Sequence, residues 1–250
     1  MNTSAIYHVD ADDIPSTSIT NKCVVLDLDL TLVSTQESLE SLKALNILSD
    51  PTLIPLRNRI YYLVVEDYET PGGGEKYEFW GVTRPHIYDF LIFCFSYFKI
   101  VAVWSAGKRK YVEAIVDHIF KDLPKPHVMF TSENVEMVSG NALGKPLIKM
   151  IESNDVLRRN MSLKNTFAVD DNSMTFSMNP GNGILIPAYD PASSIDALSR
   201  DDPTLLQLKY WLLQPEVVNA KDVTILDKSK IFSISVDTYK SKLPSGYKLK

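Results

Sequence analysis

The chain has 250 residues, of which 45% are hydrophobic and 23% are charged, and its formal net charge is −5. This composition is typical of a globular protein with one large core or two small ones, and the lack of a basic stripe interleaved with aromatic residues argues against direct nucleic-acid binding. No secretory signal opens the sequence and no run reaches the roughly 18 apolar residues of a membrane-spanning helix, so we expect an intracellular protein, nuclear or cytoplasmic and not secreted.

The two ends of the chain differ in composition from its middle. Residues 1–20 are polar, and we expect them to form a flexible N-terminal extension. Residues 216–250 are increasingly rich in lysine and predict a C-terminal extension, a solvated tail with one strand-like run at 231–236. The sequence indicates no role for either extension. The main domain is expected over residues 21–215.

Two carboxylates, Asp27 and Asp29, directly follow the apolar run at residues 23–26. The run predicts a buried strand. Because residues two apart in an extended chain point to the same side, Asp27, Asp29 and Thr31 are expected to converge where the strand ends, with Leu30 facing away. In open α/β sheets, this edge is where ligands bind.

The closeness of these carboxylates predicts a cation. Two such charges about 4 Å apart repel by roughly 4 kcal/mol at an effective dielectric of about 20, so the pair stays ionised only beside a cation or with a shared proton. A hard divalent cation with oxygen ligands, Mg²⁺ first among them, meets that need. Taken alone, the same tripeptide is more typical of a solvated turn.

The next segment predicts a helix followed by a β-hairpin. Leucines at helical spacing favour a helix over residues 36–48. Two β-rich runs, 60–67 and 75–82, flank a Pro-Gly-Gly-Gly turn, which is a hairpin signal. We expect an inserted flap over about residues 59–82 beside the site. The alternative is an edge hairpin with only a packing role.

A strand followed by a polar group recurs at residues 100–104, where the apolar run ends in Ser105 and Ala106. A helix is expected over about residues 108–120. A hydroxyl and free backbone N–H groups before a helix suit a phosphate oxygen. An ordinary N-cap serine is an equally good explanation of Ser105 alone.

Two further polar groups follow in the second half. Lys145 opens a short helix, and the strand predicted at residues 166–169 ends in Asp170, Asp171 and Asn172. Alone, these features are typical of a solvated lysine and a polar turn. Strands alternating with helices along the whole chain favour an α/β fold, with a parallel sheet covered on both faces.

Together, these motifs resemble those of the haloacid dehalogenase superfamily of phosphohydrolases. Within it, the chain is most similar to the phosphatases of the RNA polymerase II C-terminal domain, also called NLI-interacting-factor-like phosphatases. The resemblance covers roughly residues 22–213, with Leu30 in place of the subgroup's usual glutamate. The four motifs are residues 27–33, Ser105, Lys145 and residues 171–173.

The resemblance implies a haloacid dehalogenase fold, a Rossmann-like parallel sheet flanked by helices, with the hairpin as a small inserted flap. It also implies a Mg²⁺-dependent phosphoprotein phosphatase that hydrolyses phosphoserine and phosphothreonine through an aspartyl-phosphate intermediate. The partner would be a phosphorylated protein segment, for which the RNA polymerase II C-terminal domain is one candidate. Neither nucleic acid nor membrane is an expected partner.

Each motif residue then has an expected role. Asp27 would be the nucleophile, Asp29 the general acid and base, and Thr31 would help hold Asp29. Ser105, Ala106 and Lys145 would bind the phosphoryl group. The expected Mg²⁺ ligands are Asp27, the Asp29 backbone carbonyl, Asp171 and Asn172.

The flap is also expected to select the substrate, because a two-stranded hairpin has two faces and cannot bury both. Exposed aromatic side chains such as Tyr62 and Trp80 would grip a proline or another apolar residue beside the phosphorylated one. The alternative is that they pack onto the main sheet. The apolar hairpin residues are Ile60, Tyr61, Tyr62, Val64, Tyr77, Phe79 and Trp80.

Two other functions remain open from the sequence. A non-catalytic module with this fold would bind a phosphopeptide or a partner chain, but that role requires neither Asp27 nor Asp29. A small-metabolite phosphatase of the same superfamily usually carries a larger cap than the hairpin at residues 59–82. The physiological substrate, its phosphosite and the oligomeric state are not indicated by the sequence.

Overall fold

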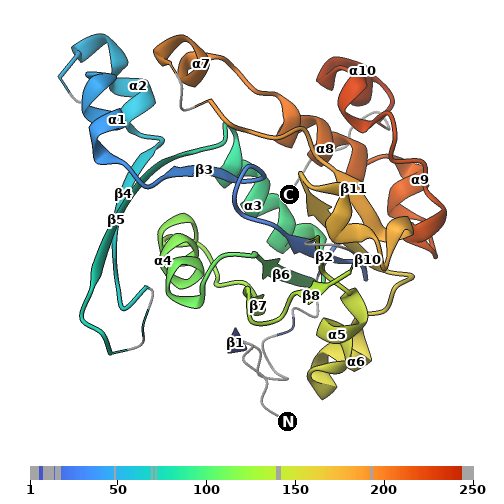
Figure 1. The fold of residues 1–250 in the computed structure, drawn as a ribbon. Coiled ribbons are helices and arrows are strands. Elements are labelled where there is room, and N and C mark those ends of the chain that lie inside the picture. The colour runs from blue at the N-terminus through green and yellow to red at the C-terminus, as the bar shows by residue number, and fades with distance from the viewer. Residues whose placement is uncertain are drawn as a thin grey trace.

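The computed structural model describes residues 6–7, 14, 18–47, 49–68, 70, 72–138, 142–191 and 194–243. A six-stranded sheet in the order β1-β7-β6-β2-β10-β11 lies at its centre (Figure 1). All neighbours pair in parallel except β1, which is antiparallel to β7. The strands are β1 (Ile6–Tyr7), β2 (Cys23–Leu26), β6 (Ile100–Trp104), β7 (Val128–Phe130), β10 (Thr166–Asp170) and β11 (Gly183–Leu185).

Helices cover both faces of this sheet, which confirms the predicted α/β class. The period-two alternation of β2 divides its buried residues between two cores: Val24 and Leu26 face one, Cys23 and Val25 the other. The first core is closed by α3 (Ile87–Tyr97), α4 (Arg109–Ile119), α8 (Thr204–Leu212) and α9 (Pro215–Val218), and the second by α5 (Leu147–Glu152) and α6 (Asp155–Asn160).

The insert is larger than the predicted hairpin. β4 (Ile60–Glu66) and β5 (Lys76–Thr83) pair as expected, but β3 (Val33–Gln36) joins the other side of β5 and makes the sheet three-stranded. Two short helices, α1 (Leu39–Ala44) and α2 (Ile54–Arg57), lie at its base (Figure 1). The predicted helix at 36–48 is shorter, since Gln36 belongs to β3 and α1 ends at Ala44. Pro71 of the predicted turn lies outside the described residues.

The C-terminal segment is folded onto the domain as far as Leu243, so the expected solvated tail is wrong there. Val223 and Tyr239 are buried in the first core. The strand-like run at 231–236 forms no strand. Gln207 of α8 holds it by donating its amide hydrogens to the carbonyls of Phe232 and Ile234 at 3.2 and 2.8 Å. Residues 244–250 lie outside the described residues. This segment contains α10 (Val236–Ser241) and the 3₁₀ turns Val223–Ile225 and Ile231–Ser233.

The predicted N-terminal extension lies mostly outside the described residues. Within it, Ile6–Tyr7 forms β1, and the Ile19 and Thr20 amides each donate a 3.0 Å hydrogen bond to the end of α3. None of the described helices is long and apolar enough to span a membrane. The remaining elements are β8 (Glu136–Met137), β9 (Leu143–Gly144), α7 (Ile195–Ser199) and the 3₁₀ turns Pro51–Leu53, Ser173–Phe176 and Pro180–Asn182.

Candidate active site

The loop after β2 shapes the site. Asp27 continues the sheet for one residue, since its amide donates to the Val169 carbonyl at 3.0 Å. The chain then turns: Leu32 and Val33 both donate to the Leu28 carbonyl, at 2.8 and 3.0 Å, and Leu30 has a left-handed φ of 59°. The extended geometry on which the sequence argument relied therefore ends at Asp27.

This turn changes the expected positions of two side chains. Thr31 is completely buried, and its hydroxyl has no hydrogen-bond partner among the residues that the structure describes, so the prediction that it holds Asp29 is wrong. Leu30 does not face away but lines the cleft that contains Asp27. Both differences follow from the left-handed residue, which breaks the period-two alternation.

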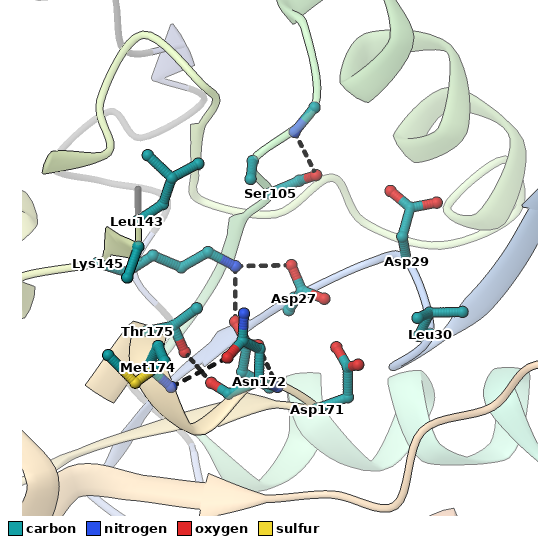
Figure 2. Close-up of a pocket in the computed structure, with 14 residues that line it drawn as sticks. Asp27, Asp29, Leu30, Ser105, Leu143, Lys145, Asp171, Asn172, Met174 and Thr175 are labelled. Carbon is teal, nitrogen blue, oxygen red and sulfur yellow. Dashed lines mark hydrogen bonds and ion pairs between the residues drawn. The ribbon is translucent and has the colours of Figure 1, made fainter. Parts of the chain in front are cut away.

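Lys145 lies between two carboxylates on the floor of the cleft. Its Nζ is 2.7 Å from Oδ1 of Asp27 and 2.6 Å from Oδ2 of Asp170, and all three residues are buried (Figure 2). Burial lowers the pKa of Lys145, but the two carboxylates raise it more, so the ammonium stays charged. Burial also raises the pKa of Asp27, to about 7, and Lys145 opposes that rise only in part. The lysine thus favours the ionised form of Asp27.

Three carboxylates form the group that fits a metal ion. Ligand oxygens of Asp27, Asp170 and Asp171 all lie within 4.8 Å of one another. Burial, followed by the charge of Asp170, raises the pKa of Asp171, as is expected where carboxylates crowd together. A hard divalent cation with oxygen ligands fits this donor set. The identity of the ion is not fixed by these residues.

Asp170 was missing from the predicted ligand set. Asp170 is the last residue of β10, and Asp27 is the first residue after the neighbouring parallel strand β2. Because both carboxylates follow strand-like apolar runs in the sequence, this shared position could have indicated that Asp170 belongs to the site. Asn172 lines the cleft, but its Oδ1 accepts a 3.0 Å hydrogen bond from the Met174 amide and caps a 3₁₀ turn. Its role as a ligand remains a prediction.

Asp29 lies on the wall of the cleft opposite Lys145 (Figure 2). The Tyr111 hydroxyl of α4 donates a hydrogen bond to its Oδ1. Burial raises the pKa of Asp29, and the hydrogen bonds from Tyr111 and Thr35 oppose that rise. A partly buried carboxyl group with a raised pKa is a suitable proton donor.

Ser105 completes the polar lining. Its amide donates to the Phe130 carbonyl at 3.1 Å, and its Oγ accepts a 3.0 Å bond from the Gly107 amide. The hydroxyl proton is therefore still available to a ligand. The cleft has a volume of about 400 Å³, and its remaining lining is Leu30, Ala106, Gly107, Ala142, Leu143, Met174 and Thr175.

Comparisons with known proteins identify the family. The model of the NLI interacting factor-like phosphatases matches residues 22–224. The chain belongs to this family. Its fold is of the haloacid dehalogenase type. No protein of the curated set matches this sequence.

Two solved structures of Fcp1 share the fold of this NLI interacting factor-like phosphatase. The fission yeast RNA polymerase II CTD phosphatase Fcp1, a variant bound to beryllium fluoride, has a TM-score of 0.52 and 14% identity, over 75% of this chain and 48% of that one. Another Fcp1 structure, of an essential RNA polymerase II CTD phosphatase, has a TM-score of 0.53 and 16% identity, over 88% of this chain and 61% of that one. This chain therefore spans about half to three-fifths of the Fcp1 chains.

The structure of this family member does not bring Tyr62 and Trp80 to the cleft. Trp80 is completely buried beneath α1, where its Nε1 donates to the Ser38 carbonyl at 2.8 Å. Tyr62 is 48% exposed and donates to Glu78 on the insert. Neither residue lines the cleft. The covering of Trp80 by α1 rules out its predicted contact with a substrate, whereas a contact of the exposed Tyr62 with a bound chain remains a prediction.

Proposed function

We propose that this phosphatase hydrolyses phosphoserine and phosphothreonine in proteins, with Mg²⁺, through an aspartyl-phosphate on Asp27. The observation that carries the proposal is the Lys145 ammonium between Asp27 and Asp170, at the ends of neighbouring parallel strands. The single charge of the buried Lys145 offsets one of the three crowded carboxylates of Asp27, Asp170 and Asp171 and leaves two net negative charges, which suit a divalent cation.

The residues of the cleft divide the chemistry between them. Asp27 attacks phosphorus while the bond to the serine or threonine oxygen breaks, and Asp29 gives its proton to that oxygen. Asp29 then takes a proton from the water that hydrolyses the aspartyl-phosphate. Ser105 and Lys145 bind phosphoryl oxygens. Mg²⁺, when held by Asp27, Asp170 and Asp171, would neutralise charge on the phosphoryl group.

The shape and lining of the cleft favour a polypeptide substrate. Its rim includes Leu143 and Met174, which are 38% and 43% exposed and lie on the side where Lys145 enters (Figure 2). Met137, directly opposite Leu143 in the β8–β9 pair, is 77% exposed. An apolar residue beside the phosphorylated one would bury this surface. The RNA polymerase II C-terminal domain is a candidate, by family and by similarity to Fcp1.

The direct test is hydrolysis by the purified chain. With Mg²⁺ at mildly acidic pH, we expect release of phosphate from phosphoserine and phosphothreonine peptides and from p-nitrophenyl phosphate, and loss of both activities in EDTA. Activity that survives EDTA would contradict the metal assignment. Peptide binding without turnover would support the non-catalytic module, and turnover of small phosphates alone would support a metabolite phosphatase.

Substitution of the apolar rim tests how the substrate is held. Leu143→Ala and Met174→Ala each remove part of a side chain that would be buried by a peptide, so we expect kcat/KM for phosphopeptides to fall by about 3- to 10-fold, a larger loss than for p-nitrophenyl phosphate. Tyr62→Ala, on the exposed part of the insert, is the matched control. A selective loss in Tyr62→Ala alone would restore the hairpin as the specificity element.

A further inference from the structure

Three hydroxyl groups from three different elements converge on Asp29. Tyr111 of α4 donates to Oδ1 of Asp29, and its oxygen lies 2.7 Å from Oγ1 of Thr35 in β3. Oγ1 of Thr35 lies in turn 2.6 Å from the hydroxyl of Tyr61 in β4. Through these contacts, the insert and the central domain both hold one side chain of the cleft.

Asp29 is the end point of this hydrogen-bond network. The Tyr111 hydroxyl donates to Oδ1 of Asp29 and also lies within hydrogen-bond distance of Oγ1 of Thr35. Thr35 bonds Asp29 as well, and either hydroxyl of the Thr35–Tyr61 pair can be the donor. Two hydroxyls therefore bond Asp29, and Tyr61 contacts one of them.

Two glycines make room for the tyrosine rings. A Cβ atom at Gly107 would lie 2.8 Å from Cδ1 of Tyr111, and one at Gly81, directly opposite Tyr61 in the β4–β5 pair, would overlap the ring of Tyr61. Both glycines have φ angles outside the left-handed region, so it is the close approach that requires them. Tyr111 and Tyr61 are 6% and 3% exposed. The hydroxyls are thus held by rigid surroundings.

We propose that Tyr111 is a positioning residue for Asp29, supported by Thr35 and Tyr61. Because Oδ1 accepts the hydrogen bond from Tyr111, the proton of the neutral carboxyl group is carried on Oδ2. The same bond fixes the side chain, which stands on a turn rather than on a strand. This inference rests on the proposed function, in which Asp29 gives its proton to the leaving oxygen.

The hydroxyl of Tyr111 is separable from its ring. The ring packs on Phe79 with centroids 5.2 Å apart, and this contact remains in Tyr111→Phe. The residue that we expected to hold Asp29, Thr31, makes no such bond. Tyr111→Phe therefore removes one hydrogen bond to the carboxyl group and leaves the packing in place.

The experiment compares two substrates that differ in their need for an acid. A phosphoserine peptide has an alkoxide leaving group that must be protonated, whereas dinitrophenolate leaves without a proton. In Tyr111→Phe, we expect kcat/KM for the peptide to fall by about 10- to 100-fold, part of the roughly 10²- to 10⁴-fold that a positioned general acid supplies, and kcat/KM for dinitrophenyl phosphate to fall far less. Tyr97→Phe, which removes a buried hydroxyl bonded to the Leu212 carbonyl, is the control.

A second comparison separates positioning from a general structural effect. In the Asp29→Asn background, Tyr111→Phe is expected to cause no further loss on the peptide, because the two residues act as one unit. If Tyr111→Phe folds poorly, Thr35→Ser and Thr35→Val supply the test, with the serine variant retaining peptide activity that the valine variant loses. Equal losses on both substrates, or an additional loss in the Asp29→Asn background, would overturn the inference.

These outcomes are distinct from failure of the proposed function. Wild-type protein that hydrolyses neither substrate would overturn the proposed function, and this inference with it. If Asp29→Asn shows the selective loss on the peptide but Tyr111→Phe and Thr35→Val do not, the proposed function stands and only the positioning role is wrong.

Discussion

Asp27→Asn is expected to abolish turnover and the covalent phosphoenzyme together. Asparagine has the same shape as aspartate, and its side-chain oxygen keeps the contact with Lys145, so the fold of the cleft is preserved. It lacks the charge that attacks phosphorus, and loss of a nucleophile typically costs more than about 10³-fold in kcat. The measurement is phosphate release, together with intact-mass analysis of protein exposed to beryllium fluoride.

The matched control for this variant is Asp170→Asn. Asp170 contacts the same lysine at 2.6 Å and is equally buried, but in the proposed mechanism it forms no bond to phosphorus. We expect lower activity with the adduct still on Asp27. Residual turnover in Asp27→Asn near the level of the wild type, or an adduct on Ser105, would overturn the assignment of the nucleophile.

The positions of the strands that build this site are predictable from local sequence. Short apolar runs bounded by polar residues predicted β2, β6 and β10, and residues at successive positions alternate between the two cores as the strand period requires. Because parallel strands end at one edge of the sheet, the polar residues after each run were predicted to meet. The structure brings Asp27, Ser105 and Lys145 into one cleft.

The turn after Asp27 was not predictable in the same way. Leucine rarely adopts a left-handed φ, so Leu30 gives no local signal of a turn. Its backbone is held by one local and one distant bond: the Leu30 amide donates to the Val33 carbonyl at 2.7 Å, and the Leu30 carbonyl accepts from the amide of the distant Tyr189 at 2.7 Å. These bonds offset the strain, and they depend on tertiary structure that alternation along a strand does not reveal.

The burial of Trp80 within the insert is a second effect of long-range structure. Trp80 stands in an alternating run that predicts one exposed face, but Leu42, Leu56 and Leu198 close a separate small core over it. Two of these residues come from short helices inside the insert and one from α7. The hairpin pattern alone does not show that other segments return to bury its aromatic residues.

Asp29→Asn is expected to separate the two halves of the reaction. With a phosphoserine peptide, the variant lacks the proton that the leaving oxygen needs, and kcat/KM is expected to fall by about 10²- to 10⁴-fold. With dinitrophenyl phosphate, Asp27 still forms the aspartyl-phosphate at nearly the wild-type rate, since that leaving group needs no acid. Hydrolysis of the intermediate is slow because the base is missing, so the phosphoenzyme accumulates.

The readouts are kcat/KM on both substrates and the fraction of phosphorylated protein in quenched reactions. Asp171→Asn is the comparison, because loss of a proposed metal-holding carboxylate weakens phosphoryl binding whatever the leaving group, and both substrates are expected to lose equally without accumulation of phosphoenzyme. Equal losses on both substrates in Asp29→Asn would remove it from the proton-transfer role. The selective loss is expected because Asp29 lies on the wall of the cleft opposite Lys145, apart from the carboxylates that contact this lysine. The Oδ1 atom of Asp29 is bonded to Tyr111 instead.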